Sequence, residues 1–329
     1  MIIAVIGDGG WGTTLAIHLS HLGHSIRLWG VFPDYIDILK SKKENIKFLP
    51  GIKIPDSIKL SSDIAEVVDG AGLIILAVPS QYMRSVLKRL RKDKHCVNFV
   101  STAKGIERKT LLRMSEVVNE ALGDVKLSVL SGPSIAYEVA RRMPTTIVAA
   151  SEDKDFAKET QALFTTENLR IYTSSDIIGV ELGGSLKNIV AFASGVADGL
   201  GFGANSKAAI LTRGMQELTR LGSAMGAKRE TFSGLSCMGD LVTTCMSRHS
   251  RNRWLGEEIG KGRDIGEVIK STEMVVEGFT TTKSAYELAK RVNVEMPITN
   301  EAYKILYEKK DPKKAVKDLM TRTPKDEIY

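Results

Sequence analysis

The chain has 329 residues, of which 43% are hydrophobic and 26% are charged, as is usual for a globular protein. Its length and composition exclude collagen-like, intrinsically disordered and disulfide-scaffold proteins. The longest strongly apolar run, Leu73–Val78, is far shorter than the roughly 20 residues of a spanning helix, so membrane insertion is not expected. The initial residues Met1–Ile6 are too few for the apolar part of a signal peptide.

The formal net charge is +7, with basic clusters at residues 40–43, 84–94 and 309–317. A basic surface fits either a nucleic acid or anionic membrane, or a small anionic substrate. Within Val86–Arg91 the basic residues alternate with apolar ones, as on the solvated side of a helix. No stripe of aromatic residues accompanies them for base stacking. A small anionic substrate is therefore favoured, and no nucleic-acid partner is expected.

The three cysteines, Cys96, Cys237 and Cys245, form no Cys-x-x-Cys pair, which indicates reduced thiols and a cytoplasmic location. The five histidines have no metal-binding spacing, and the cysteines cannot complete a zinc site. No metal is expected.

In the first half of the chain, short apolar runs alternate with helical patterns. The runs predict strands at Ile2–Ile6, Ser25–Trp29, Leu73–Val78, Val97–Ser101, Leu127–Leu130 and Thr146–Ala149. Because these runs are continuous in apolar residues, they are expected to be buried parallel strands. Helices are predicted between several of them, at Thr13–Leu22, Met83–Leu90 and Leu111–Leu122. This order predicts a parallel sheet with helices on both faces.

From about Ile177 onward the pattern is helical only. Helices are predicted at Ile177–Ala197, Ala204–Met225, Phe279–Val292 and Thr299–Tyr307. The sequence therefore predicts two domains: a doubly wound, Rossmann-type α/β domain over residues 1–176 and an all-helical domain over residues 177–329.

The hexapeptide GDGGWG at residues 7–12 matches the pattern G-x-G-x-x-G, directly after a predicted strand and before a predicted helix. In this context Gly7 allows a tight turn, Gly9 the close approach of a pyrophosphate, and Gly12 close packing of the helix. The helix N-terminus supplies amide donors and a positive dipole to phosphates. The alternative is a glycine-rich turn without a ligand, and the context favours dinucleotide binding.

Three later predicted strands end in the turns Pro79-Ser80, Thr102–Gly105 and Ser131–Ser134. If the strands are parallel, these turns lie at the sheet edge where open α/β sheets bind ligands. Lys104 is the charged residue in these turns. Lys104 is about equally expected to contact a ligand or to be simply solvated.

Lys187 interrupts an apolar helical pattern and shares a helix face with Gly183, Gly184, Ala191 and Ser194. Such small residues indicate either close helix packing or a cavity. Because an unpaired buried ammonium is costly, a cavity that admits a polar ligand is favoured. Further along, residues 248–253 alternate arginine with hydroxyl and amide side chains, which suits either a phosphate or a plain basic loop.

The chain resembles the bacterial-type NAD(P)-dependent glycerol-3-phosphate dehydrogenases over nearly its whole length. The resemblance rests on the glycine loop with its tryptophan and on further segments at residues 131–134, 182–188, 198–205, 212–214, 239–242, 250–253, 276–278 and 294–299. It implies a Rossmann-type sheet followed by an all-α domain like that of 6-phosphogluconate dehydrogenase. It also implies the reduction of dihydroxyacetone phosphate to sn-glycerol 3-phosphate, which supplies phospholipid synthesis.

By this resemblance, Lys187 is the catalytic acid and base. The residues implied for the substrate pocket are Lys104, Gly132, Ser134, Asp240, Ser250, Arg251 and Asn252. The residues implied or expected for the coenzyme are Gly7, Gly9, Gly10, Trp11, Gly12, Lys104, Ala136, Arg251, Val275 and Glu277. A protonated Lys187 would stabilise the developing oxyanion, with its pKa lowered by burial or by Lys104. Asp240 would orient Lys187, and Arg251 would anchor the substrate phosphate.

The coenzyme is NAD or NADP, and the sequence leaves the preference open. The second predicted strand ends in Gly30, Val31 and Phe32, which offer neither the acid typical of NAD sites nor the base typical of NADP sites. Both coenzymes are expected to work with a small preference, unless Arg27 or Lys40 folds over the adenosine.

Two other functions stay open at this point: a reductase of β-hydroxyacids with the same architecture, and a dinucleotide sensor without catalysis. The phosphate-binding pattern at residues 250–252 argues against the first, and Lys187 on its small-residue face argues against the second. A homodimer is also left open.

Overall fold

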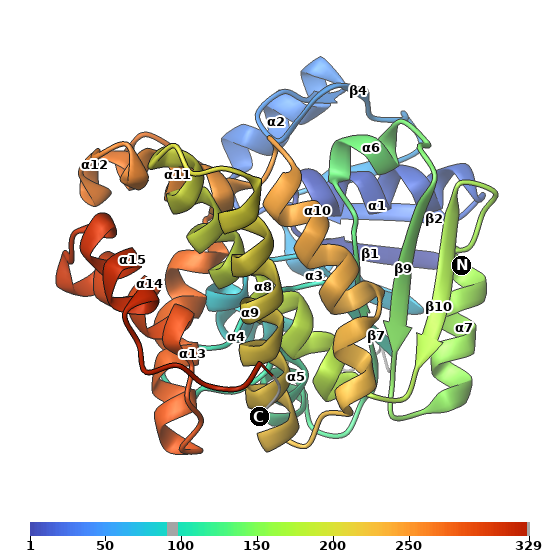
Figure 1. Ribbon diagram of the computed structural model, residues 1–329. Helices are drawn as coiled ribbons and strands as arrows, with labels where there is room; N and C mark the ends of the chain where they lie inside the picture. The colour runs from blue at the N-terminus through green and yellow to red at the C-terminus, as the bar shows by residue number, and fades with distance from the viewer. Residues whose placement is uncertain (91–97, 328–329) are drawn as a thin grey trace.

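The computed structural model describes residues 1–90 and 98–327, which form a sheet-centred half and a helical half (Figure 1). The central sheet has eight strands in the order β5-β2-β1-β6-β7-β8-β9-β10, and β3 and β4 form a separate hairpin. The strands are β1 Ile2–Ile6, β2 Ser25–Trp29, β3 Glu44–Asn45, β4 Leu49–Lys53, β5 Lys59–Ser61, β6 Leu73–Leu76, β7 Asn98–Ser101, β8 Lys126–Ser131, β9 Thr145–Ala150 and β10 Leu169–Ser174.

The six strands from β5 to β8 are parallel, and their order is that of a doubly wound sheet. The predicted parallel strand at Thr146–Ala149 is β9, which instead runs antiparallel to β8, so that part of the prediction is wrong. The strands β5 and β10 and the β3–β4 hairpin were not predicted from the sequence. β10 lies at the sheet edge with half of its side chains exposed, and β3 and β5 are very short. Position 97 of the predicted strand Val97–Ser101 lies outside the described residues.

Helices cover both faces of the sheet. Ile3 and Val5 of β1 pack with α1, α2 and α7 on one face, whereas Ala4 and Ile6 pack with α3, α4 and α5 on the other. This alternation follows from the two-residue period of a strand. The helices of this half are α1 Gly10–His21, α2 Pro33–Lys42, α3 Ile64–Val68, α4 Met83–Leu90, α5 Met114–Leu122, α6 Ala136–Ala140 and α7 Lys154–Phe164, with a 3₁₀ turn η1 at Ser80–Tyr82.

The helical half is built around α8, which is buried along almost its whole length. Its elements are α8 Ile177–Gly199, α9 Ala204–Ala224, α10 Asp240–Met246, α11 Arg251–Gly260, α12 Ile265–Lys270, α13 Glu277–Arg291, α14 Pro297–Glu308 and α15 Pro312–Met320, with the short turns η2 Arg229–Ser233 and η3 Leu235–Gly239. By length and composition α8 is apolar enough to cross a membrane, but 89% of its most apolar window is buried inside the protein. A helix that is apolar all round is typical of a protein core.

Glycines bring α8 and α11 into backbone contact. A Cβ atom at Gly195 would lie 1.9 Å from the carbonyl oxygen of Arg253, and one at Gly256 would lie 2.0 Å from that of Phe192. Only glycine fits at these two positions without moving a backbone. The close contact fixes α11, which begins at Arg251, against the central helix.

A buried polar cluster joins α8 to the sheet-centred half. The Glu181 carboxylate of α8 accepts hydrogen bonds from Arg113 Nη1 at 2.6 Å and from the backbone N–H of Ser115 at 2.8 Å. Glu181 is 5% exposed, so this ion pair is shielded from water. The cluster fixes the position of α8, and therefore of Lys187, relative to the sheet.

Candidate active site

The glycine loop connects β1 to α1 at the carboxyl edge of the sheet. Gly7 has φ of 121°, and a Cβ there would lie 2.6 Å from the carbonyl oxygen of Ala77 at the end of β6. A Cβ at Gly12 would lie 1.9 Å from the carbonyl oxygen of Gly7, whereas one at Gly9 would meet nothing within 4 Å. The loop is thus closely packed at Gly7 and Gly12 and open at Gly9. No side chain there caps the first amides of α1. Open amides at a helix N-terminus suit a phosphate group.

The other predicted coenzyme residues lie around this loop or across from it. Phe48 covers Gly10, because a Cβ there would lie 2.6 Å from the Phe48 carbonyl oxygen, and Trp11 packs beside the sheet core with Phe48. Ala136 begins α6, and its carbonyl oxygen accepts a hydrogen bond from Thr14 of α1. The β4 hairpin and α6 therefore frame the start of α1.

Glu277 reaches the same sheet edge from the helical half. Its carboxylate accepts hydrogen bonds from the backbone N–H of Ser80 at 2.8 Å and from Ser80 Oγ at 2.6 Å. Burial raises the pKa of Glu277, and the two bonds from Ser80 oppose that rise. Val275, two residues earlier, is 48% exposed. These contacts place the start of α13 over the end of β6.

Lys104 follows β7, and its side chain reaches both the turn after β8, at residues 131–134, and the helical half. Its Nζ donates to the carbonyl oxygen of Gly132 at 3.0 Å and to Asp240 Oδ2 at 2.7 Å. Gly132 has φ of 142°, and Ser134 Oγ donates to its carbonyl oxygen at 2.9 Å. The turns after β7 and β8 therefore meet at one polar point, as their parallel strands predict.

Asp240 connects two ammonium groups. Its Oδ1 accepts a hydrogen bond from Lys187 Nζ at 2.7 Å, and its Oδ2 is the oxygen held by Lys104. Lys187 also donates to Thr244 Oγ1 at 2.6 Å, while that hydroxyl donates to the carbonyl oxygen of Asp240. Lys187 is 6% exposed and Asp240 is 2% exposed. The cluster carries two positive charges and one negative charge, so it attracts an anion.

Burial lowers the pKa of Lys187 to about 8. Asp240 opposes this shift by favouring the charged ammonium, and the second cation, Lys104, adds to it. An amine with a pKa near 8 is protonated at neutral pH and still releases its proton readily. This property suits a group that acts as an acid in one direction and as a base in the other.

Asp240, the residue expected to orient Lys187, is its charged partner in the structure. The small-residue face does pack closely: a Cβ at Gly183 would lie 2.7 Å from Cys237 Cβ, and one at Gly184 would lie 2.5 Å from Ser131 Oγ. Glycine at these positions lets η3 and the end of β8 approach α8. Lys187 thereby reaches the edge of the sheet.

The structure separates the roles of the basic segment at residues 248–253. Ser250 Oγ caps α11 by accepting from the backbone N–H of Arg253, and the Arg253 guanidinium binds Asp198 at 2.6 Å. Asn252 is 9% exposed and donates to Asn188 of α8 at 2.8 Å. Arg248 and Arg251 are the exposed arginines of this segment, and Arg251 is the one that begins α11.

Three polar residues that support this site were not predicted as site residues: Thr244, Ser80, which was identified only as part of a strand-end turn, and Asn188, which was identified only within the segment at residues 182–188. Thr244 carried a usable signal, because it follows Asp240 by one helical turn and must share its face. Ser80 and Asn188 meet their partners, Glu277 and Asn252, across 197 and 64 residues of sequence. No local pattern could have indicated those two pairings.

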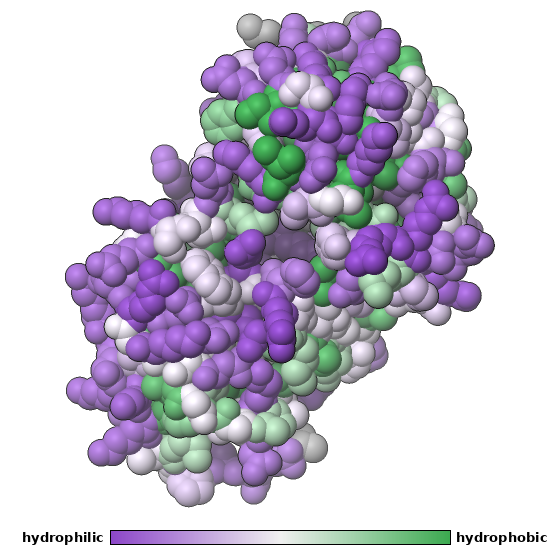
Figure 2. Space-filling view, turned by 90° about the horizontal axis from the view of Figure 1, so that it is seen from above, coloured by the Kyte–Doolittle hydropathy of each residue, from purple (hydrophilic) through white to green (hydrophobic). Residues whose placement is uncertain are grey.

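The polar site lies on the face toward which β6, β7 and β8 point. β9 points downward in Figure 1 and β8 runs antiparallel to it, so the carboxyl end of β8 lies toward the top of that view. Figure 2 views this upper face and shows a hollow near its middle with hydrophilic residues around it. In residues 1–90 and 98–327, no group of three His, Cys, Asp or Glu side chains could hold a metal ion.

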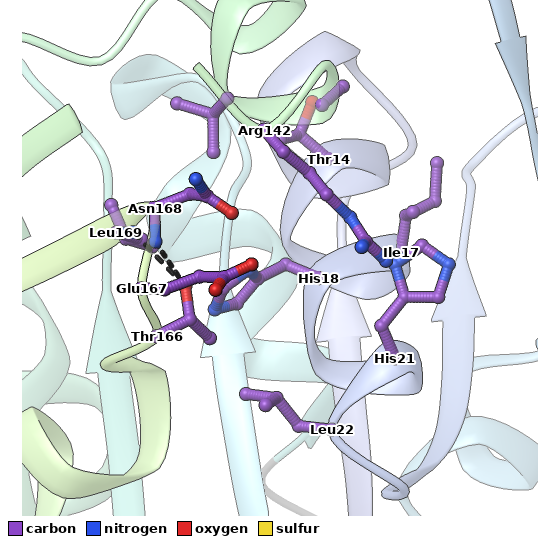
Figure 3. Close-up of a pocket in the computed structure, with 12 residues that line it drawn as sticks. Thr14, Ile17, His18, His21, Leu22, Arg142, Thr166, Glu167, Asn168 and Leu169 are labelled. Atoms are coloured by element: carbon purple, nitrogen blue, oxygen red, sulfur yellow. Dashed lines mark hydrogen bonds between the residues drawn. The ribbon is translucent and has the colours of Figure 1, made fainter. Parts of the chain in front are cut away.

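A separate cavity of about 170 Å³ lies between α1, the end of α6 and the segment before β10 (Figure 3). His18, His21 and Arg142 line it together with Glu167. Burial lowers the pKa values of both histidines, and the charge of Arg142 adds to the effect. None of the residues predicted for substrate or coenzyme lies in this cavity.

The chain is similar to known proteins over its whole length. The family described as NAD-dependent glycerol-3-phosphate dehydrogenase matches with its N-terminal part at residues 2–157 and its C-terminal part at residues 176–317. Glycerol-3-phosphate dehydrogenase (NAD(P)+) of Chlorobium phaeobacteroides is 49% identical over 332 aligned positions, which cover 100% of this chain and 99% of that protein. The corresponding protein of Prosthecochloris aestuarii is also 49% identical, with 100% of both chains covered.

A solved structure shows the same architecture. The crystal structure of glycerol-3-phosphate dehydrogenase from Coxiella burnetii superposes with a TM-score of 0.94 at 38% identity, covering 98% of this chain and 99% of that one. Together with the sheet order and the helical half, these similarities confirm the predicted Rossmann-type fold and the resemblance. The chain belongs to the NAD-dependent glycerol-3-phosphate dehydrogenase family.

Proposed function

We propose that the protein interconverts dihydroxyacetone phosphate and sn-glycerol 3-phosphate, with NAD or NADP as its coenzyme. The observation that carries this proposal is the buried Lys187 ammonium, which Asp240 and Thr244 hold at the sheet edge that also bears the open glycine loop. A proton donor beside a dinucleotide cradle is what the reduction of a carbonyl group requires.

The glycine loop fits the pyrophosphate of a dinucleotide, since Gly9 leaves open space above the uncapped amides of α1. The proposed contacts to the coenzyme come from Gly7, Gly9, Gly10, Trp11, Gly12, Lys104, Ala136, Arg251, Val275 and Glu277. When bound, the nicotinamide supplies or accepts the hydride. The protein's own residues position the substrate, exclude water and move the proton.

Lys187 is the proposed catalytic residue. In the reductive direction its Nζ donates a proton to the carbonyl oxygen as negative charge develops there, and in the oxidative direction the neutral amine takes the proton from the alcohol. Asp240 keeps the amine in place and favours its charged form. Lys104 keeps the cluster positively charged, which stabilises an oxyanion.

The substrate phosphate is proposed to bind at the start of α11. Arg251 is exposed there, and a guanidinium can hold two phosphate oxygens at once. Gly132, Ser134, Ser250 and Asn252 complete the proposed pocket, with Asn252 acting through its buried contact with Asn188 rather than as a free side chain. Anchoring a phosphate far from the carbonyl fixes the orientation of the reacting atoms.

The remaining features of the proposal concern organisation and location. A division at residues 176 and 177 into a coenzyme-binding and a helical substrate-binding domain is supported by the end of β10 at Ser174 and the start of α8 at Ile177. A cytoplasmic location is supported by the free, buried thiols of Cys237 and Cys245. The product would supply phospholipid synthesis, and a homodimer would be compatible with the fold.

The direct test is oxidation of NADH or NADPH by the purified protein in the presence of dihydroxyacetone phosphate. Unphosphorylated dihydroxyacetone serves as the control substrate, because it has the carbonyl group but lacks the phosphate. The proposal requires turnover that depends on the phosphorylated substrate. A protein that binds the coenzyme but oxidises it no faster than background would instead be a dinucleotide sensor.

A further inference from the structure

The end of β2 has no acidic residue of its own. NAD-binding sheets usually place an aspartate or glutamate about 20 residues after the glycine loop, where it binds the 2′-hydroxyl of the adenosine ribose. Here β2 ends at Trp29, and Gly30, Val31 and Phe32 follow. Val31 is 48% exposed and Phe32 is 67% exposed, so this segment presents apolar side chains to the solvent.

Arg27 and Lys40, the two basic residues considered for the adenosine, are directed elsewhere, and the Arg89 guanidinium lies over the Trp29 ring, 5.0 Å from its centroid. Arg27 Nη1 donates to the carbonyl oxygens of Glu66 at 2.8 Å and Asp69 at 2.6 Å, in the middle of α3 and just after its end. Lys40 lies on α2 beside Asp37, at 3.4 Å. The alternative in which Arg27 or Lys40 covers the adenosine is therefore not the arrangement observed.

A carboxylate from the glycine loop occupies the space after β2 instead. A Cβ atom at Gly30 would lie 2.3 Å from Asp8 Oδ2 and 2.6 Å from Asp8 Cγ. The Asp8 carboxylate therefore stands where a side chain at position 30 would begin, and it can do so only because residue 30 is glycine. The backbone N–H of Gly7 donates to the carbonyl oxygen of Trp29 at 2.9 Å, which holds the loop against the strand end.

One oxygen of the Asp8 carboxylate, Oδ2, lacks a hydrogen-bond donor among the described residues. This oxygen is buried. Burial also raises the pKa of Asp8. The backbone around it is well held, because fully buried Asn45 donates to the Asp8 carbonyl oxygen at 2.7 Å. A buried acceptor without a donor is unfavourable, so a ligand hydroxyl at this point would be stabilised.

We propose that Asp8 replaces the missing acid of β2: its carboxylate accepts a hydrogen bond from the 2′-hydroxyl of the adenosine ribose, and the protein prefers NADH to NADPH. The 2′-phosphate of NADPH would bring negative charge to a carboxylate that forms no ion pair with the described residues. This inference rests on the proposed dinucleotide site. It replaces the expectation of a small preference, which was based on the residues after β2 and on Arg27 and Lys40.

The test measures coenzyme binding rather than turnover, by titrating the wild-type protein and its variants with NADH and with NADPH and following coenzyme fluorescence. Wild type is expected to bind NADH at least about tenfold more tightly than NADPH, the change given by one good polar contact. In Asp8→Ala the ratio should fall to near one, through weaker NADH binding and tighter NADPH binding. Asp34→Asn, an exposed acid on α2, is the matched control and should leave the ratio unchanged.

A second variant returns the acid to its usual place. Asp8→Ala combined with Gly30→Asp removes the overlap with the Asp8 carboxylate, and the new Cβ then requires only that Ile36 Cδ1, at 2.8 Å and at the far end of its side chain, shifts. This double variant should regain the NADH preference that Asp8→Ala loses. Failure to regain it in a folded protein would mean that a carboxylate at this point does not select the coenzyme.

Wild type alone also decides the question, should the variants not fold. Adenosine 5′-monophosphate and adenosine 2′,5′-bisphosphate differ only at the ribose 2′ position, and the inference requires weaker binding of the 2′-phosphorylated compound. Equal or tighter binding of that compound would overturn it. If the NADH preference is present but dihydroxyacetone phosphate is not reduced, the proposed function fails and the inference about Asp8 stands.

Discussion

The glycine loop and the Lys187 centre lie at the same edge of the sheet but are built in different ways. The loop is six consecutive residues, and its shape depends on backbone contacts and on the absence of side chains at its glycines. The Lys187 centre joins side chains from three distant segments, at Lys104, Lys187 and Asp240. The loop therefore depends on local sterics, whereas the centre depends on how the helical half is fixed to the sheet.

The largest expected effect concerns the Lys187 centre. Replacing Lys187 with alanine should lower kcat by about 10²–10⁴-fold, the usual contribution of a general acid or base. Binding of NADH should change little, because the glycine loop is a separate structure. Steady-state kinetics and NADH titration of the same preparation measure both quantities. Near-normal turnover by a folded Lys187→Ala protein would remove the centre from the mechanism.

The attachment of α8 to the sheet gives the next effect. Glu181→Ala should lower the free energy of unfolding by about 3 kcal/mol, because it removes the buried partner of the Arg113 guanidinium and leaves only the more exposed Glu116 at 3.0 Å. Glu120→Ala is the control, since Glu120 pairs with Arg84 at a side-chain exposure of 55% and should contribute less than about 1 kcal/mol. Urea unfolding of both variants measures the difference. Equal losses would contradict a special role for the buried pair.

Gly9 and Gly12 of the loop should respond differently to the same added methyl group. Gly12→Ala should destabilise the protein by about 1–3 kcal/mol, because the methyl would overlap the Gly7 carbonyl oxygen. Gly9→Ala should keep the stability within about 0.5 kcal/mol, since nothing in the protein contacts the new atom. It should instead weaken NADH binding by about tenfold, by occupying space intended for the pyrophosphate. Identical behaviour of the two variants would refute this division of roles.

A smaller effect tests the phosphate site. Arg251→Lys keeps the charge but loses the two-pronged hydrogen bonding of guanidinium, so KM for dihydroxyacetone phosphate should rise by about tenfold. Turnover of unphosphorylated dihydroxyacetone should be unaffected by the same substitution. An equal effect on both substrates would show that Arg251 does not recognise the phosphate.

Local features of the molecule were predictable from the sequence. The glycine loop, the parallel strands β1, β2, β6, β7 and β8, and the long helices α8 and α9 each have a continuous pattern that determines their structure. The apolar run of β9 resembles that of a buried parallel strand and therefore predicts a parallel strand. The direction of a strand depends on the connection to its neighbour rather than on its apolar residues, and β9 is antiparallel to β8.

The contacts between distant segments were not predictable from such patterns. The pairing of Glu277 with Ser80 joins two elements that approach each other only once the helical half packs on the sheet. Asp8 is different, because it stands inside the motif that was identified. The position of the Asp8 carboxylate after β2 depends on Gly30, which lacks a side chain and therefore leaves space for that carboxylate.

The most direct test of the Lys187 centre is the pH dependence of kcat/KM for wild type in both directions. Reduction needs the protonated amine of Lys187, whose pKa is lowered to about 8. The kcat/KM of reduction should therefore fall as the pH rises through that value. Oxidation needs the neutral amine and should rise over the same range. Opposite pH profiles with a shared midpoint would support the account. Profiles that run in the same direction, or that persist in Lys187→Ala, would contradict it.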